Sequence, residues 1–206
     1  MTQVGTKECQ FRPLGAVASV HSGLPTYRLR TEASVPIPVL KVRDLNHAHE
    51  PSWKLGTVEV PRPDRLESHR TRTRDIVVTA RGTNLKVALV PDRWNGALVD
   101  WNLIVIRPGS RVRPELLVGF LQSPAGRRAM DRRLTGTSLL MLTVKNLEEI
   151  EIPVPPLDQQ ERLVQLLQSA DRQYESAIAA AELRRRIAQK VAWDAMKGAR
   201  DEGESA

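Results

Sequence analysis

Short apolar runs separated by turn-forming residues fill the first 110 positions of the chain. Alternating or β-branched runs occur at residues 16–20, 37–42, 57–60, 75–79, 86–90 and 103–106. The segments between them are rich in Gly, Pro, Asn and Asp, which favour turns. Short strands at a spacing of about ten residues are typical of a sheet with long loops. This half of the chain is therefore predicted to form a mixed or antiparallel β core.

The pattern becomes helical after residue 113. A short apolar segment at 116–121 is followed by Ser123 and Pro124, which supply an N-cap and a proline at the first helical position of a second segment. A strand is predicted at 149–152, and the three prolines that follow it exclude regular structure. This proline-rich run is interpreted as a domain boundary.

Residues 158–197 are predicted to form one long helix of roughly 60 Å. Asp158 and Glu161 are interpreted as a capping box at its start, and Gly198 stands where a glycine would end it. Apolar and small residues recur at spacings of three, four and seven and define one face of the helix. The members of this face are Leu163, Leu167, Ala170, Tyr174, Ala177, Ala181, Ala188, Val191 and Ala195.

The apolar face of the long helix needs a covering partner. Two partners are open: the rest of this chain, or a helix from another chain, which the length of the helix favours. Arg184 interrupts the face, and its predicted role is to set the register of pairing or to contact an acidic partner.

The chain has 206 residues and a mass of 23.1 kDa, which fits one domain, or one domain with an appendage. Its single Cys excludes an intramolecular disulfide framework and a Cys-based zinc site. No stretch approaches the roughly 20 apolar residues of a membrane span, and the first residues lack the apolar core of a signal peptide. A soluble, cytoplasmic protein is expected.

The positive charge is confined to one half of the chain. Residues 1–113 contain 18 Lys and Arg against 10 Asp and Glu, a net +8, whereas residues 114–206 contain 13 against 14, a net −1. Most of the basic residues are Arg, whose guanidinium makes bidentate contacts with phosphate and with guanine edges. Nucleic acid is the expected partner, and a thermally adapted or GC-rich source is the alternative explanation of the arginine content.

Side chains suited to contacting DNA are concentrated in the loops of the first half. In the major groove, Arg pairs with guanine and Asn pairs with adenine. The candidates are Arg28, Arg30, Arg43, Asn46, Arg70, Arg72, Arg74, Asn84, Lys86, Arg93 and Asn95. The alternation of Arg and Thr at 70–74 is the densest group, and a solvated strand face is its alternative interpretation.

Other polar and aromatic side chains have ordinary interpretations. His47 and His49 lie far from other candidate ligands, so no metal site is expected. Trp53, Trp94 and Trp101 are interpreted as packing residues rather than as a stacking platform for single strands. The sequence lacks a Walker A loop, a GxSxG elbow, an HExxH pair and the Asn/Asp-Pro-Pro-Tyr/Phe run of adenine methyltransferases. The protein is therefore not expected to be an enzyme.

Several motifs follow one another in a distinctive order. They are the strand pair at 75–83 and 85–90, the apolar segment 116–121 with Gln122-Ser123-Pro124-Ala125-Gly126, then Thr135-Gly136-Thr137-Ser138, and finally Ile152-Pro153-Val154-Pro155-Pro156-Leu157 with Gln160. In this order they resemble the DNA specificity subunits of type I restriction-modification systems. In that family the proline-rich run joins a target recognition domain to a spacer helix. The resemblance covers residues 11–197.

The resemblance implies an α+β fold in three parts. Residues 1–156 form a target recognition domain with a mixed or antiparallel β core and short helices, residues 157–198 a long coiled-coil-type spacer and dimerisation helix, and residues 199–206 a disordered tail. Family subunits contain two such domains and two such helices, so this chain resembles half a subunit. Two copies paired through antiparallel helices would recognise a pseudo-palindromic bipartite site. Pairing with a different specificity chain, which gives an asymmetric site, is the alternative.

The implied function is recognition of a double-stranded DNA half-site for a type I-like restriction-modification or phage-defence complex. The chain itself needs no cofactor, because a docked methyltransferase subunit contributes S-adenosylmethionine and the active site. A restriction or translocase subunit is a further candidate partner. Two other functions stay open from the residues alone: a protein-interaction adaptor and a stand-alone DNA-binding regulator.

Overall fold

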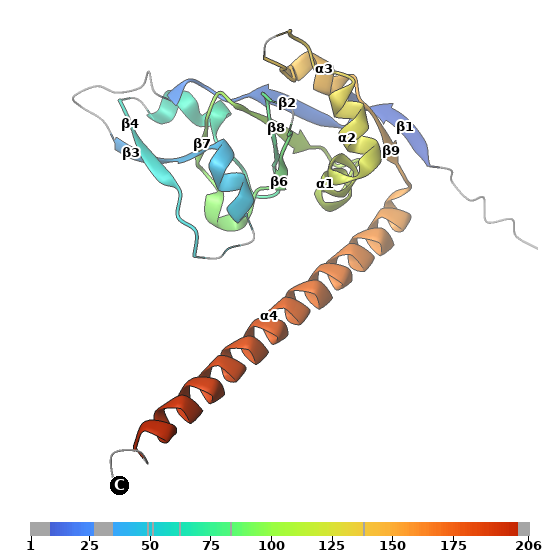
Figure 1. The fold of residues 1–206 in the computed structure, drawn as a ribbon. Helices are drawn as coiled ribbons and strands as arrows, with labels where there is room; N and C mark the ends of the chain where they lie inside the picture. Colours follow the sequence, from blue (N-terminus) through green and yellow to red (C-terminus); the bar gives the residue numbers. More distant parts are fainter. Residues whose placement is uncertain are drawn as a thin grey trace, which may run out of the picture. The chain divides into compact units, whose positions relative to one another are not determined.

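The computed structural model describes residues 9–26, 35–48, 50, 52–61, 63–82, 84–137 and 139–201 of the chain. The chain divides into two compact units, residues 1–162 and residues 163–206. The described strands and short helices belong to the first unit, whereas the second unit is the continuation of one long helix (Figure 1).

An antiparallel sheet of four strands forms the framework of the first unit. Its strand order is β2 (Ala18–Ser22), β8 (Leu103–Pro108), β5 (Ile76–Thr79) and β6 (Val87–Leu89). All of β5 is buried, because Ile76 and Val78 belong to one hydrophobic cluster and Val77 belongs to another. Burial on both faces explains why this strand is a continuous apolar run and not an alternating one.

Two smaller sheets lie in the same unit. β4 (Gly56–Val60) pairs antiparallel with β3 (Val35–Leu40), and β7 (Leu98–Val99) pairs parallel with the end of β3. β1 (Gln10–Pro13) pairs antiparallel with β9 (Glu151–Val154). The mixed and antiparallel β core predicted from the sequence is therefore confirmed.

Short helices follow the central sheet in the sequence. α1 (Pro114–Gln122) and α2 (Pro124–Asp131) meet at Ser123, whose hydroxyl accepts a hydrogen bond from the N–H of Gly126 at 3.2 Å, as the predicted N-cap requires. Gly126 permits close packing, since a Cβ there would lie 2.1 Å from a carbonyl oxygen of α1. α3 (Val144–Glu148) is likewise capped by a threonine hydroxyl.

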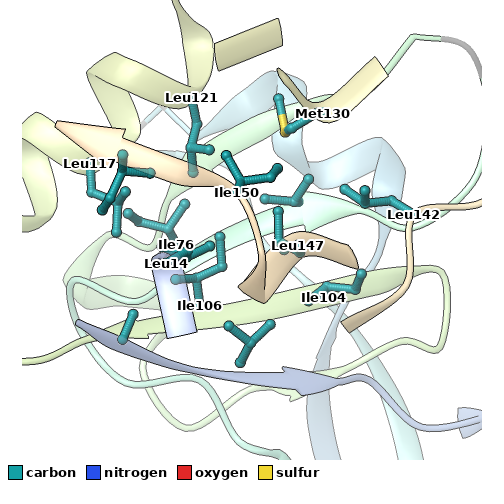
Figure 2. Close-up of a cluster of buried hydrophobic side chains, with 14 of the residues drawn as sticks. Leu14, Ile76, Ile104, Ile106, Leu117, Leu121, Met130, Leu142, Leu147 and Ile150 are labelled. Carbon is teal, nitrogen blue, oxygen red and sulfur yellow. The ribbon is translucent and has the colours of Figure 1, made fainter. Parts of the chain in front are cut away.

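One hydrophobic cluster packs these helices onto the central sheet. Figure 2 shows its side chains converging from both kinds of element: Ile76 and Ile104 come from strands, whereas Leu117, Met130 and Leu147 come from the three helices. Each of these side chains is at most 2% exposed. Burial of such a side chain contributes roughly 1.5–3 kcal/mol, so this cluster holds the sheet and the helices together.

The strand near the proline-rich run differs from its prediction. β9 begins at Glu151, two residues later than predicted, because a capped helix, α3, occupies the residues before it. It also includes Pro153, which the sequence assigns to a boundary without regular structure. Pro153 faces Phe11 of β1, and among the described residues β9 pairs only with β1, so a strand with one free edge accommodates the missing N–H.

The long helix, α4 (Leu157–Asp201), is longer than predicted at both ends. It begins one residue before Asp158, which lies in its first turn, and it continues through Gly198. A glycine inside a helix is disfavoured by only about 1 kcal/mol relative to alanine, so one glycine need not end a helix of this length. Residues 202–206 of the predicted tail lie outside the described residues. Within the described ranges, no helix combines the length and apolar character of a membrane span.

Gln160 fixes the first turn of α4 to the rest of the first unit. Its side chain is fully buried, and its Nε2 donates to the carbonyl oxygens of Arg111 at 2.9 Å and Pro155 at 2.8 Å. Its Oε1 accepts from the N–H of Arg113 at 2.8 Å. The three bonds join the start of α4 to the segment before α1 and to the proline-rich run, so residues 157–162 belong to the same compact unit as the strands.

A buried ion pair joins the two middle strands of the central sheet. Asp75, directly before β5, is 2% exposed and accepts from Nε and Nη2 of Arg107 in β8 at 2.9 and 2.8 Å. Its Oδ2 also accepts from the N–H of Arg72 at 2.8 Å, and Arg107 donates to the carbonyl oxygen of Arg70. The pair therefore fixes the backbone that leads into β5.

Replacing Gln160 by Leu should lower the free energy of unfolding by at least about 2 kcal/mol, because one N–H and two carbonyl groups lose their partner. Urea denaturation measures the change. The matched control is Gln165→Leu, since Gln165 is an exposed residue of the same helix. Equal stability of the two variants would contradict this role.

Replacing Arg107 by Met should lower the free energy of unfolding by about 3 kcal/mol, since it leaves the buried Asp75 carboxylate without its counter-ion. Adding Asp75→Asn should restore part of the loss, because the neutral amide still accepts from the N–H of Arg72. Thermal and urea unfolding measure both variants. A double variant less stable than the single one would show that the charge is not the cause.

Candidate nucleic-acid interface

Three loops of the first unit contain most of the described candidate DNA-contacting residues. We call them the arginine loop (residues 70–74), the Trp94 turn (residues 92–96) and the Asp44 turn (residues 42–48). The N–H of Thr71 donates to a backbone carbonyl beside the Trp94 turn at 2.8 Å, and the N–H of Gly96 donates to the carbonyl of Thr71 at 2.9 Å. The first two loops are thus held side by side by their backbones.

Arg93 links the Trp94 turn to the Asp44 turn. Its Nη2 donates to the carbonyl oxygens of His47 at 3.1 Å and Ala48 at 2.6 Å. Its guanidinium carbon lies 5.2 Å from the centre of the Trp94 ring, and that ring is buried in the second hydrophobic cluster. Both hydrogens of this nitrogen are therefore used inside the protein, and the three loops form one group.

The Asp44 turn is organised around a buried carboxylate. Asp44 is 1% exposed and accepts from the N–H of Lys41 at 2.8 Å and from the indole of Trp53 at 3.1 Å. Two predicted contact residues, Arg43 and Asn46, are exposed on this turn. The Nε of Arg43 lies 3.7 Å from the Asp44 carboxylate, but 70% of the Arg43 side chain is exposed.

Two of the three arginines in the arginine loop are tied to the protein. Arg70 donates through Nη1 to the carbonyl of Gly96 at 2.8 Å, and its Nε lies 2.8 Å from the Glu67 carboxylate. Arg74 has a φ of 69°, in the left-handed region, and its guanidinium lies 2.6 Å from the carboxylate of Glu115 in α1. These partners fix the two ends of the loop.

Arg72 differs from its two neighbours. It is exposed, and its side chain has no hydrogen-bond or ion-pair partner among the described residues. It lines a hollow of about 300 Å³ together with Glu67, Ser68, Arg70, Thr71, Asn95 and Gly96. It also lines a second hollow of about 370 Å³, with Thr73, Arg74, Asp75, Arg107, Pro108 and Pro114.

Sequence reasoning did not find the other residues of the first hollow. Glu67 and Ser68 have no distinguishing pattern in the sequence. Asn95-Gly96 is a turn signal, and the φ of +80° at Gly96 fits that interpretation. The sequence therefore indicated the turn at Asn95-Gly96 but not the hollow that this turn lines.

Asn84 and Lys86 lie apart from the three loops. β5 and β6 form an antiparallel pair. Where β5 ends, the N–H of Lys86 donates to the hydroxyl of Thr79, whereas beside the start of β5 the N–H of Arg74 donates to the carbonyl oxygen of Val90. The two predicted residues therefore occupy the opposite end of the β5–β6 pair. The structure does not bring them to the site.

Arg81 lies near that end of the β5–β6 pair. Its guanidinium carbon is 3.8 Å from the centre of the Trp101 ring.

Arg28, Arg30 and His49 lie outside the described residues. His47 contacts Glu50 through Nδ1 at 2.7 Å and stacks on the Trp53 ring, with 3.6 Å between ring centroids. No group of three potential metal ligands occurs in the described part of the chain.

The predicted apolar face of α4 is exposed within this chain. The exposed positions are Leu163, Leu167, Ala170, Tyr174, Ala177, Ala181, Arg184, Ala188 and Val191. Three further apolar side chains that flank this face, Leu166, Ile178 and Ile187, are exposed as well.

Comparisons with known proteins identify the family. Residues 7–182 match the model of the type I restriction modification DNA specificity domain. No match was found among curated proteins. Among solved structures, a chain from a study of complex assembly and conformational transition of the type I R-M system is similar, with 18% identity and a TM-score of 0.59. The match covers 89% of this chain and 45% of that one.

Two specificity subunits have the same fold. The HsdS subunit from Thermoanaerobacter tengcongensis is 18% identical with a TM-score of 0.53, and the match covers 84% of this chain and 40% of that one. The type I S subunit from M. genitalium is 13% identical with a TM-score of 0.55, over 90% and 45%. This chain thus spans less than half the length of these structures. Because the family model covers most of its sequence, the chain belongs to the type I restriction modification DNA specificity domain family.

Proposed function

We propose that this chain is the DNA-recognition half-subunit of a type I-like restriction-modification or phage-defence complex. Its first unit binds a half-site of double-stranded DNA, and α4 pairs with a second specificity chain and docks a methyltransferase subunit. The observation that chiefly supports this proposal is the family match over residues 7–182, which includes the three loops and the first half of α4.

The three loops support DNA binding because they are anchored while some of their polar side chains stay exposed. Arg43, Asn46, Arg72 and Asn95 are exposed on loops whose backbones are fixed by Asp44, Asp75, Arg93 and other buried or tethered groups. Preorganised groups lose less conformational entropy on binding. In this proposal, phosphate contacts supply affinity and base contacts supply sequence preference.

The seven-residue repeat of α4 supports pairing of two copies. The apolar face alternates in steps of four and three from Leu163 to Ala195, as in a coiled coil. Antiparallel pairing with full overlap of this face places Leu167 opposite Val191 of the second copy. It also places Arg184 opposite Tyr174, where a cation can lie on an aromatic ring. The interrupting arginine would therefore favour this register.

The width of the apolar surface supports docking of a further helix. Leu166, Ile178 and Ile187 flank the narrow face that two paired helices bury, and they are exposed in this chain. A methyltransferase subunit that covers them would contribute S-adenosylmethionine and the catalytic residues. A restriction or translocase subunit would join the same complex. This chain would supply the choice of DNA sequence.

Methylome sequencing of cells with and without the gene should reveal a bipartite motif that disappears on deletion. A symmetric motif would indicate a homodimer, and an asymmetric one would indicate two different specificity chains. Unchanged methylation would contradict the proposal. Normal methylation by a variant without residues 1–113 would indicate an adaptor, and tight sequence-specific binding without any partner would indicate a stand-alone regulator.

Replacing Leu167 by Asp should raise the dissociation constant of the dimer by about two orders of magnitude, because two symmetry-related leucines leave the interface. Sedimentation at several concentrations measures the constant. Leu183→Asp is the matched control, since Leu183 is exposed on the same helix but lies off the repeat. Equal weakening by both variants, or a monomeric wild-type chain, would contradict self-pairing through this face.

A further inference from the structure

The hollow between the arginine loop and the Trp94 turn presents hydrogen-bond donors on two sides. One side is formed by Asn95. Its Oδ1 accepts from the N–H of Thr73 at 3.2 Å, and because a backbone N–H can only donate, this contact fixes the orientation of the amide. The Nδ2 of Asn95 has no partner among the described residues, and Asn95 is exposed. Its two N–H groups are therefore available to a ligand.

Arg72 forms the other donor side. It lines the same hollow, and a guanidinium has donors and no acceptor. Its backbone N–H is held by the buried Asp75 carboxylate at 2.8 Å, so the base of the side chain is fixed while its end is exposed. The conformation of this segment is further fixed by the neighbouring Arg74, which is paired with Glu115.

The remaining side chains of the hollow leave hydrogen-bond donors as its main free groups. The Glu67 carboxylate is an acceptor, but its charge is compensated by an ion pair with Arg70, whose Nε lies 2.8 Å from the Oε1 of Glu67. The hydroxyl of Thr71 is buried and bonded to backbone groups. Ser68 can donate or accept. A ligand that enters the hollow therefore meets free donors from Arg72 and Asn95.

We propose that this hollow binds a pair of hydrogen-bond acceptors on DNA, with Arg72 and Asn95 as the donors. Two groups of a duplex have this chemistry: the O6 and N7 edge of guanine in the major groove, and the oxygens of a phosphate. Bidentate recognition of adenine needs the Oδ1 of Asn95 as an acceptor, and the bond from the N–H of Thr73 already uses one of the two lone pairs of this oxygen and fixes its direction, so the proposal assigns to Asn95 the role of a donor only. This inference rests on the proposed function and assigns the ligand of its site.

Asn95→Asp tests the inference in the complex of this chain with its methyltransferase subunit. The carboxylate still accepts from the N–H of Thr73, so the turn is retained, but the outward donors are replaced by an acceptor. Asn84→Asp is the matched control, because it introduces the same charge on an exposed asparagine at the other end of the β5–β6 pair. Binding is measured against duplexes with a randomised half-site and at several salt concentrations.

If the acceptors are those of guanine, Asn95→Asp lowers the ratio of the affinities for a G·C pair and for other pairs at one position by roughly 5- to 150-fold. Asn84→Asp leaves this ratio unchanged. Replacement of that guanine by 7-deazaguanine weakens wild-type binding and leaves Asn95→Asp unaffected. If the acceptors are phosphate oxygens, binding weakens uniformly over all sequences. Arg72→Gln, a change at an exposed side chain, then makes the negative slope of log affinity against log salt shallower by about 0.9.

Two results would overturn the inference. One is that Asn95→Asp and Arg72→Gln match Asn84→Asp in both base preference and salt dependence. The other is that Asn95→Asp changes the preference at an adenine position. A wild-type complex without any sequence preference would overturn the proposed function itself, so the two failures are distinguishable.

Discussion

The carboxylate of Asp75 connects the hydrophobic framework of the first unit to its loops. It is buried directly before β5, at the point where the most apolar strand of the sheet leaves the arginine loop. Its ion pair with Arg107 joins β5 to β8, and its bond to the N–H of Arg72 fixes the backbone that presents an exposed guanidinium. A charge buried at this depth requires its partner, so the sheet and the loop are stable only together.

Many of the basic residues that suggested a nucleic-acid partner have structural roles. Arg70, Arg74, Arg93 and Arg107 each use their guanidinium to bind a carbonyl or carboxylate of the protein. The net charge of a domain therefore overstates the number of basic side chains that are available to a ligand. The exposed residues that the tethered arginines position are fewer, and Arg72 is the clearest of them.

The sequence predicted the elements whose signals are local. The β-branched runs became strands, the Ser123 cap is present, and α4 includes all of the predicted residues 158–197. β1 was not predicted, because it has only four residues and all of them are exposed, so no buried face distinguishes it from a loop. The roles of the arginines could not be predicted, because their partners are distant in sequence: Arg74 and Glu115 are 41 positions apart, and Arg93 and His47 are 46 apart.

The chemistry of the tethers affects how such a domain can evolve. Arg70 and Arg93 donate to main-chain carbonyl oxygens, which every amino acid provides. Under the proposed function, mutation of an exposed neighbour such as Asn46 would change the group offered to a base and would leave these carbonyl acceptors in place. On the proposed function, a lineage could acquire a new target sequence by single substitutions while the main-chain tethers of the loops are inherited.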